Sequence, residues 1–289
     1  MEKNFKFVTI NFAKLNNFCG EIYKEIENNN FIDLINKDIT KIKDEEIKVR
    51  LLLIGNSINF SFWEKSYDNT YNKDGFQGSM AMWHIVLTNP LFRTNEGLKD
   101  IVMNSFHDHF NEIPLSEERV SCLNEVLGFL TITKNLLGWI KQFSSARDLI
   151  SNVIRSLPSF KDLQNGVHFN KRATCFAYML KRYGILDDTY EFEETYILAD
   201  YHIPKLFHEN GVLLYSEELE SKIRNNEELV ENSIQEFEIR FSTVIVGIEI
   251  LRILRKNNIN IDSNTLDEVL WRMAKKIIKP YHLVRTLKY

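Results

Sequence analysis

The sequence predicts an all-α fold: mainly helical, with short β-like runs that allow a minor β-hairpin. Only 11 glycines and 5 prolines interrupt the 289 residues, and apolar side chains recur at helical spacing along most of the chain. Strands do not alternate with helices as they do in proteins built on a parallel sheet. The length is sufficient for one large core, and there is no repeat or linker. We therefore expect a single domain over residues 1–289.

Capping signals and periodicity place the individual helices. Ser116 and Ser216 each precede two glutamates, which is typical of a helix start, and Asn264 precedes a carboxylate at the third helical position. Gly211 is a candidate C-terminal cap, and Pro280 should stop the last helix. The predicted helices span residues 12–28, 43–54, 79–88, 96–110, 117–142, 145–156, 171–184, 216–225, 231–256 and 265–279.

Three short apolar runs, at residues 7–10, 51–54 and 212–215, have the composition of strands and could form a minor sheet. Residues 68–76 (DNTYNKDGF) are polar and rich in turn formers, so we expect a surface loop there.

Charge and composition exclude several classes of function. A net charge of -4 argues against a stable nucleic acid partner, which needs a basic face, although a basic pocket for one phosphate remains compatible with it. No apolar run is long enough to span a membrane, and the N-terminus lacks a secretion signal. The three cysteines, Cys19, Cys122 and Cys175, are widely separated and fit reduced thiols. We expect a cytoplasmic protein with no membrane association.

Metal and cofactor motifs are weak or absent. His107 and His109 lie two residues apart, so on a helix they point to different faces. Surface or capping histidines are favoured over a metal pair by roughly four to one. The sequence contains no paired CxxC, no Gly-x-Ser-x-Gly elbow and no complete phosphate loop. We expect neither a metal nor a cofactor.

Three charged islands stand in otherwise apolar sequence: residues 171–173 (KRA), 199–204 (ADYHIP) and 236–240 (EFEIR). Asp200 ends an apolar run, and a carboxylate with little bulk water acts strongly on its neighbours. Glu238 and Arg240 lie among apolar residues, where a structural ion pair and a ligand contact explain them equally well. Asp267 is slightly better explained as a helix cap. Together the islands indicate a buried polar site.

Residues 59–63 (NFSFW) alternate aromatic and polar side chains. Phe60 and Phe62 alternate with Ser61 and Trp63, so one aromatic pair could face the core and the polar atoms a cavity. A plain core segment with Asn59 as a capping residue has about even odds.

The same islands resemble motifs of the queuosine salvage protein family, the queuosine 5′-phosphate N-glycosidases. The family's Leu-Asn-Phe-x-Phe-Trp is similar to residues 58–63, and its Lys-Arg-Ala matches 171–173. Further motifs follow in the same order: Gly-Tyr-x-Ser-Leu, in part, at 75–80, Ile-Pro-Leu-x-x-Glu-Arg at 113–119, Phe-Ala-Asp-Tyr-Arg-x-Pro at 198–204, Gly-Val-Leu-x-Tyr-Ser at 211–216, Glu-x-Glu-Ile-Arg at 236–240, Asp-x-x-Leu-Trp at 267–271, and His-x-x-Arg-Thr with a terminal Tyr at 282–289.

The resemblance covers residue 50 onward and implies a helical fold related to helix-hairpin-helix DNA glycosylases. It also implies release of the base queuine from queuosine 5′-monophosphate or a related 7-deazaguanine nucleotide. This chain departs from the family pattern at Leu198, His202 and Arg272, where an aromatic residue, an arginine and an acid are usual. Two alternatives stay open: a non-catalytic helical protein that binds a nucleotide or tRNA, and the same chemistry on the nucleoside.

Cleavage of an N-ribosidic bond develops positive charge on the ribose. Asp200 is the candidate that stabilises this charge and accepts a proton from water, and Lys171 is its candidate partner. Queuine carries an ammonium, for which Asp267 and Glu238 are candidates.

The remaining predicted contacts concern the base and the phosphate. Phe60, Phe62, Trp63 and Tyr201 are candidates to stack on the base. The phosphate would need cationic donors such as Arg240, His282 and Arg285. Asn59, Leu198 and Trp271 complete the predicted substrate contacts.

Overall fold

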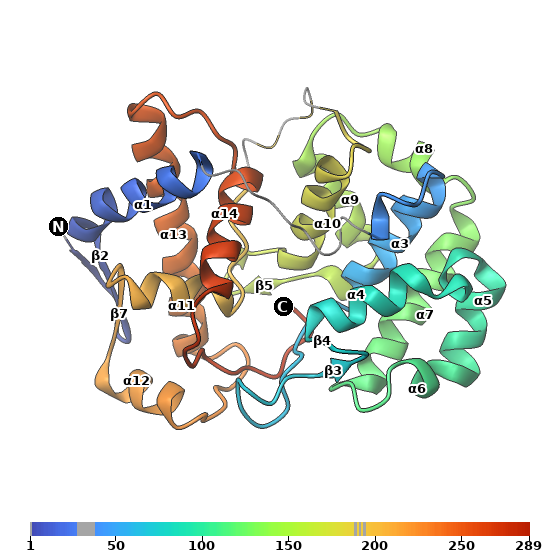
Figure 1. Cartoon of the computed structure of the whole chain (residues 1–289), viewed down its shortest axis with the longest axis horizontal. Helices are drawn as coiled ribbons and strands as arrows, with labels where there is room; N and C mark the ends of the chain where they lie inside the picture. The colour runs from blue at the N-terminus through green and yellow to red at the C-terminus, as the bar shows by residue number, and fades with distance from the viewer. Residues whose placement is uncertain (1, 28–37, 188–189, 191, 193–194) are drawn as a thin grey trace.

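Helices dominate the computed structural model of the chain, which describes residues 2–27, 38–187, 190, 192 and 195–289 (Figure 1). This confirms the prediction of a mainly helical fold. Most of the predicted helices are present with ends shifted by a few residues. Their bounds are α1 Leu15–Glu27, α3 Glu45–Ser57, α4 Ser79–Thr88, α5 Asn95–Asp100, α6 Phe106–His109, α7 Ser116–Ile132, α8 Leu136–Lys141, α9 Ala146–Ser156, α10 Lys171–Arg182, α11 His202–Glu209, α12 Glu217–Arg224, α13 Ile234–Lys256 and α14 Ser263–Lys275.

The largest sheet is small and joins distant parts of the sequence. Strand β2 (Val8–Asn11) pairs antiparallel with β1 (Glu2–Asn4) on one side and with β7 (Leu213–Tyr215) on the other. Two of the three predicted strand-like runs are therefore strands, and they pair with each other. Among the described residues there are also two short hairpins, β3–β4 (Asn72–Lys73, Phe76–Gln77) and β5–β6 (Leu163–Gln164, Val167–His168). The first begins in the loop predicted at 68–76 and ends one residue after it.

The third run, residues 51–54, is not a strand but the middle of α3. Every residue from Leu51 to Ser57 is buried, so the second half of this helix has no polar face, although the helix predicted over residues 43–54 covers the run. An apolar run of four residues does not distinguish a buried helix from a strand.

Several predicted helix boundaries were wrong. The helix expected over 117–142 ends at Ile132, and a second helix begins after Asn135, whose side chain accepts the N–H of Gly138. The helix expected over 96–110 contains a π-helical turn at Ile101–Ser105. Ser216 caps α12 as predicted, but α7 begins after Leu115, and Asp262 rather than Asn264 caps α14.

Helix α11 is not among the predicted helices, and it includes Pro204 as its third residue. Proline is tolerated in the first turn of a helix, where its missing N–H has no partner to lose. Gly211, at φ +64, follows this helix, and its N–H donates to the carbonyl of His208. Its predicted role in ending a helix is confirmed.

Two apolar cores lie on either side of the molecule (Figure 1). The first core is built mainly from α3 to α10, and the second from β2, α1, α11, α13 and α14. Ile197 belongs to the second core and Leu198 to the first, so the chain crosses between them just before Asp200.

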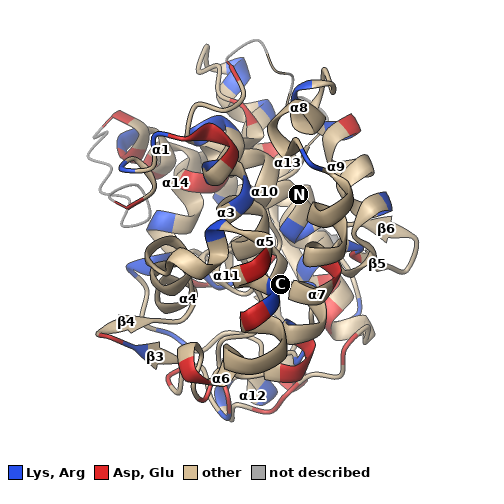
Figure 2. Cartoon of the chain, turned by 90° about the vertical axis from the view of Figure 1, so that its right-hand side faces the viewer, with Lys and Arg blue, Asp and Glu red and all other residues tan. Residues whose placement is uncertain are grey.

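Charged residues of both signs are interspersed along the helices in the view of Figure 2. Within the described part of the chain, no helix is both long and apolar enough to cross a membrane.

Candidate active site

A cavity of about 410 Å³ lies between the two cores, a size typical of small-molecule sites. Helices α4 and α10 contribute lining residues from the first core, and α14 contributes them from the second. The crossing segment, residues 198–203, forms a further part of the wall. Seven of the predicted site residues line this cavity: Asn59, Lys171, Leu198, Asp200, Tyr201, Asp267 and Trp271.

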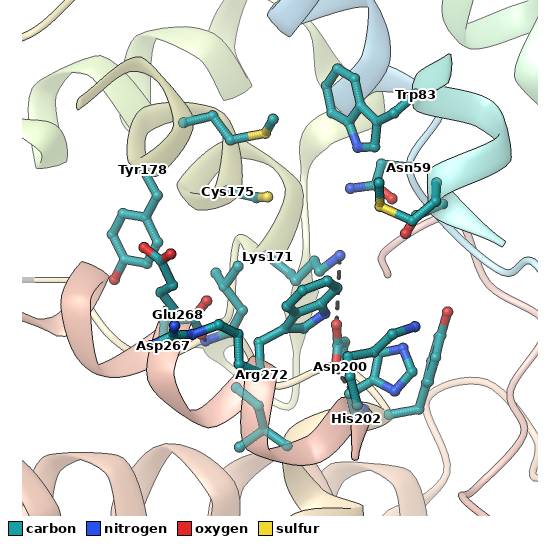
Figure 3. A pocket seen from close by; sticks show the side chains of 18 of the residues that line it. Asn59, Trp83, Lys171, Cys175, Tyr178, Asp200, His202, Asp267, Glu268 and Arg272 are labelled. Atoms are coloured by element: carbon teal, nitrogen blue, oxygen red, sulfur yellow. Dashed lines mark hydrogen bonds and ion pairs between the residues drawn. The ribbon is translucent and has the colours of Figure 1, made fainter. Parts of the chain in front are cut away.

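Lys171 and Asp200 form a buried ion pair in the cavity wall (Figure 3). The Lys171 Nζ lies 3.8 Å from the Asp200 Oδ2, and both side chains are about nine-tenths buried. The other carboxylate oxygen of Asp200 accepts the N–H of His202, 2.7 Å away, at the start of α11. Because one oxygen is held by the backbone, the carboxylate keeps a fixed orientation towards Lys171.

Asp267 is a second buried carboxylate in the same cavity. Its Oδ1 accepts the N–H of Leu198 at 2.6 Å. Burial raises the pKa of the Asp267 carboxyl to about 7, and the negative charge of Asp200 adds to this. The hydrogen bond from Leu198 and the positive charges of Arg182 and Lys171 oppose the shift. Near neutral pH, Asp267 is therefore poised between its neutral and charged forms.

The faces of two helices carry most of the polar lining. On α10, Lys171, Cys175 and Tyr178 recur at helical spacing, and Tyr178 Oη donates to the carbonyl of Tyr196. On α14, Asp267, Trp271 and Lys275 are each four residues apart and so share one face.

Aromatic rings gather near Asp200. The Tyr201 ring stacks on Tyr281 with centroids 4.5 Å apart, and His202 meets Trp271 edge-on at 6.5 Å. Burial, reinforced by Lys275, Lys205 and Lys171, lowers the pKa of His202 well below its ordinary value, so its imidazole is neutral at pH 7.

Asn59 and Trp83 lie across the cavity from Asp200 and His202 (Figure 3). Two buried arginines hold the segment that carries Asn59. Arg119 donates to the carbonyls of Phe60 and Ser61, and Arg172 donates to that of Ser57.

The aromatic members of this segment lie outside the cavity. Phe60 is in the first core, where its ring lies between the guanidinium groups of Arg119 and Arg172, at 4.3 and 5.0 Å. Phe62 is also a core residue, and Trp63 packs in a small cluster with Tyr281 and Leu283. Their predicted stacking on the base does not fit these positions, because protein atoms already cover the rings.

Glu238 and Arg240 also lie outside the cavity, on α13. Both oxygens of Glu238 accept N–H groups of residues 6–8, which ties the N-terminal strand region to the second core. Arg240 makes a two-pronged ion pair with Asp162, at 2.8 and 2.6 Å. The sequence leaves open whether Glu238 and Arg240 form structural contacts or bind a ligand. Their positions fit a structural role.

The predicted phosphate contacts His282 and Arg285 do not reach the cavity. His282 is buried, and burial with the charge of Arg240 lowers its pKa to about 3, which leaves it uncharged at neutral pH. Arg285 lies over the ring of Trp63 at 5.3 Å and forms an ion pair with Glu228 at 3.6 Å.

The sequence analysis missed several lining residues, among them Trp83, Tyr178, His202 and Lys275. The helical spacing from Asp267 through Trp271 could have identified Lys275. No comparable signal marks Trp83, because α4 is mostly apolar and Trp83 lies within an apolar stretch of it.

Comparison with known proteins matches residues 39–289 to the family model described as queuosine salvage protein. The chain belongs to the queuosine salvage protein family.

Relatives in this family are similar to the chain over most of its length. A protein of Dictyostelium discoideum named queuosine 5′-phosphate N-glycosylase/hydrolase is 27% identical, over 98% of this chain and 94% of the relative. A protein of the same name from Sphaerobacter thermophilus is 28% identical, over 88% of this chain and 85% of its own. The Mus musculus protein of that name is 25% identical, over 85% of this chain and 83% of the relative.

Proposed function

We propose that the chain hydrolyses queuosine 5′-monophosphate, or a related 7-deazaguanine nucleotide, to queuine and ribose 5-phosphate, and so supplies queuine for tRNA modification. Family membership and the names of the relatives support the activity. The observation that carries the proposal is the Lys171–Asp200 ion pair enclosed in a ligand-sized cavity. The three free cysteines fit a cytoplasmic location, where thiols stay reduced.

In this reaction the bond between C1′ of the ribose and the base nitrogen breaks. Water gives a hydroxyl group to C1′ and a proton to the base. Asp200 stabilises the positive charge that develops on the ribose and accepts a proton from the attacking water. Lys171 places its ammonium 3.8 Å from the Asp200 carboxylate, and an ion pair is stronger in a dry site than in bulk water.

The cavity also suits the other parts of the substrate. Tyr201 and Trp271 present rings to the base, a type of contact worth roughly 1–3 kcal/mol per base. Asp267 is placed to accept the ammonium of queuine. Lys275, which lines the cavity and lies over the Trp271 ring at 5.5 Å, is the candidate for the 5′-phosphate in place of Arg240, His282 and Arg285.

One incubation separates this proposal from its alternatives. The purified protein is mixed with queuosine, its 5′-monophosphate or guanosine monophosphate, and free base is measured by chromatography. We expect base only from the queuosine compounds, and faster release from the monophosphate. Faster release from queuosine would instead assign the nucleoside as substrate. Binding without release would identify a non-catalytic binding protein.

Asp200→Asn keeps the size of the side chain and removes its charge. We expect release of base to slow by at least about a hundredfold, because general bases typically contribute that much, while substrate binding is retained. Single-turnover assays with equilibrium binding measure both quantities. Turnover at the wild-type rate would exclude Asp200 from the reaction.

A further inference from the structure

A buried ion pair lies directly behind the cavity wall. Asp162 and Arg240 are at most 1% exposed, and neither lines the cavity. The Arg240 Nη1 and Nη2 atoms lie 2.8 and 2.6 Å from the two carboxylate oxygens of Asp162. Such two-pronged contacts fix the relative orientation of both groups as well as their separation.

Asp162 is bonded to the backbone that carries Lys171. Its Oδ2 accepts the N–H of Lys171, 3.2 Å away, at the first residue of α10. The residue before this helix, Asn170, is in the left-handed conformation and makes no capping hydrogen bond. Asp162 therefore takes the place of a cap and sets where α10 begins.

Arg240 is bonded to the backbone that carries Asp200. Its Nε donates to the carbonyl of Ala199 at 3.0 Å. The guanidinium group packs over the rings of Phe169 and Tyr289, at 4.1 and 4.4 Å from their centroids, which limits its freedom to move.

We propose that Asp162 and Arg240 are positioning residues that set the separation of Lys171 and Asp200. One rigid pair is bonded to both backbones, and the side chains that these backbones carry meet at 3.8 Å in the cavity. This distance is near the limit of an ion pair, so a small displacement separates the charges. The inference rests on the proposed function only in that Lys171 and Asp200 are the reacting pair.

Arg240→Lys keeps the charge but cannot make three directed bonds from a planar group. We expect kcat to fall by at least about tenfold with KM little changed, because displacements of about 1 Å can cost a hundredfold in rate. A crystal structure of the variant should show a longer Lys171–Asp200 distance. A folded variant with wild-type kcat and an unchanged distance would overturn the proposal.

Loss of one charge could unfold the protein, so a second variant removes both. Asp162→Leu combined with Arg240→Met leaves no unpaired charge, and apolar replacement of a buried pair is often tolerated. We expect this variant to fold and to show the same loss of kcat. Wild-type kcat here would show that the pair only stabilises the fold.

Combining Arg240→Lys with Asp200→Asn shows whether Arg240 acts on the rate through Asp200 or through a loss of overall structure. In an Asp200→Asn background, Arg240→Lys should lower the residual rate by less than about threefold, since residues that act as a unit are not additive. A full multiplicative loss would contradict the proposal.

Glu46→Gln is the matched control. Glu46 also holds N–H groups at the start of a helix, those of Leu136 and Leu137 in α8, but it lies away from the cavity. We expect its kcat to be unchanged. If the wild-type protein released no base, the proposed function would fail, whereas the crystallographic distance would still test the positioning role.

Discussion

Two carboxylates share the cavity, and their surroundings differ. Asp200 lies beside the ammonium of Lys171, whereas the Asp267 carboxyl has a pKa raised to about 7, chiefly by burial. Pairs of acids in unlike environments can take different roles in one reaction. Under the proposed function, the carboxylate beside Lys171 serves the ribose, and Asp267 serves a cationic part of the base.

The pKa of Asp267 predicts that queuine binding depends on pH. Below about pH 7 the free carboxyl is protonated, and the proton must leave before the group can pair with an ammonium. Affinity should therefore fall as pH drops through about 7, by up to tenfold per unit. Calorimetry of queuine binding at several pH values measures this.

The control ligand is a 7-deazaguanine without the cyclopentene arm, which has no ammonium to pair. Its affinity should vary less with pH, and Asp267→Asn should flatten the curve for queuine. The same pH dependence for both ligands would remove Asp267 from ammonium recognition.

Lys275→Met tests the position of the phosphate. We expect KM for the monophosphate to rise roughly tenfold, the cost of losing a contact to a charged group, with little change for the nucleoside. The matched control is Lys279→Met, since Lys279 forms an ion pair with Glu209 and does not line the cavity. An equal rise for both substrates would place the phosphate elsewhere.

Sequence indicated which charged residues are buried but not which face the cavity. Asp200, Lys171, Glu238 and Arg240 all stand in apolar sequence, and all are buried. Only the first two line the cavity, because α13 directs its buried charges towards the backbone of other segments. The direction in which a buried side chain points depends on how the helices pack, and local sequence does not encode that packing.

At the scale of elements, α3 and α4 approach closely at Gly55. A Cβ atom there would lie 2.1 Å from the Trp83 ring, which lines the cavity. Gly55→Ala should displace the ring and destabilise the protein by about 1–3 kcal/mol, as overpacking typically does. Denaturant unfolding measures the loss.

Gly128→Ala provides the matched control in α7, where no atom lies within 4 Å of the added Cβ. There alanine should stabilise the helix by up to about 1 kcal/mol through its higher helix propensity. Similar losses at both sites would show that close packing at Gly55 is not the cause.

The sequence predicts helices correctly where one face of the helix stays polar, as in α9 and α12. The errors fell where tertiary structure overrode local signals. Helix α3 is buried along its second half, and α11 includes Pro204 in its first turn. Residues 1–49 lie outside the resemblance, and Phe7 and Phe18 among them belong to the second core.

At the scale of the whole molecule, the cavity is lined from both cores, so a bound ligand should stabilise both. At a hundred times its dissociation constant, queuine should add about 2.7 kcal/mol to the free energy of unfolding. Hydrogen exchange should slow in α10 and α14 together. Protection confined to one helix would contradict binding between the cores.

The two walls also carry different kinds of group. Lys171 stands on α10, from the first core, whereas Asp267, Trp271 and Lys275 stand on α14, from the second. Under the proposed function, the groups that select the base stand on α14, whereas the reacting pair stands on α10 and the crossing segment. A laboratory search for enzymes that accept other modified bases could randomise the cavity-facing positions of α14 while leaving Lys171 and Asp200 unchanged.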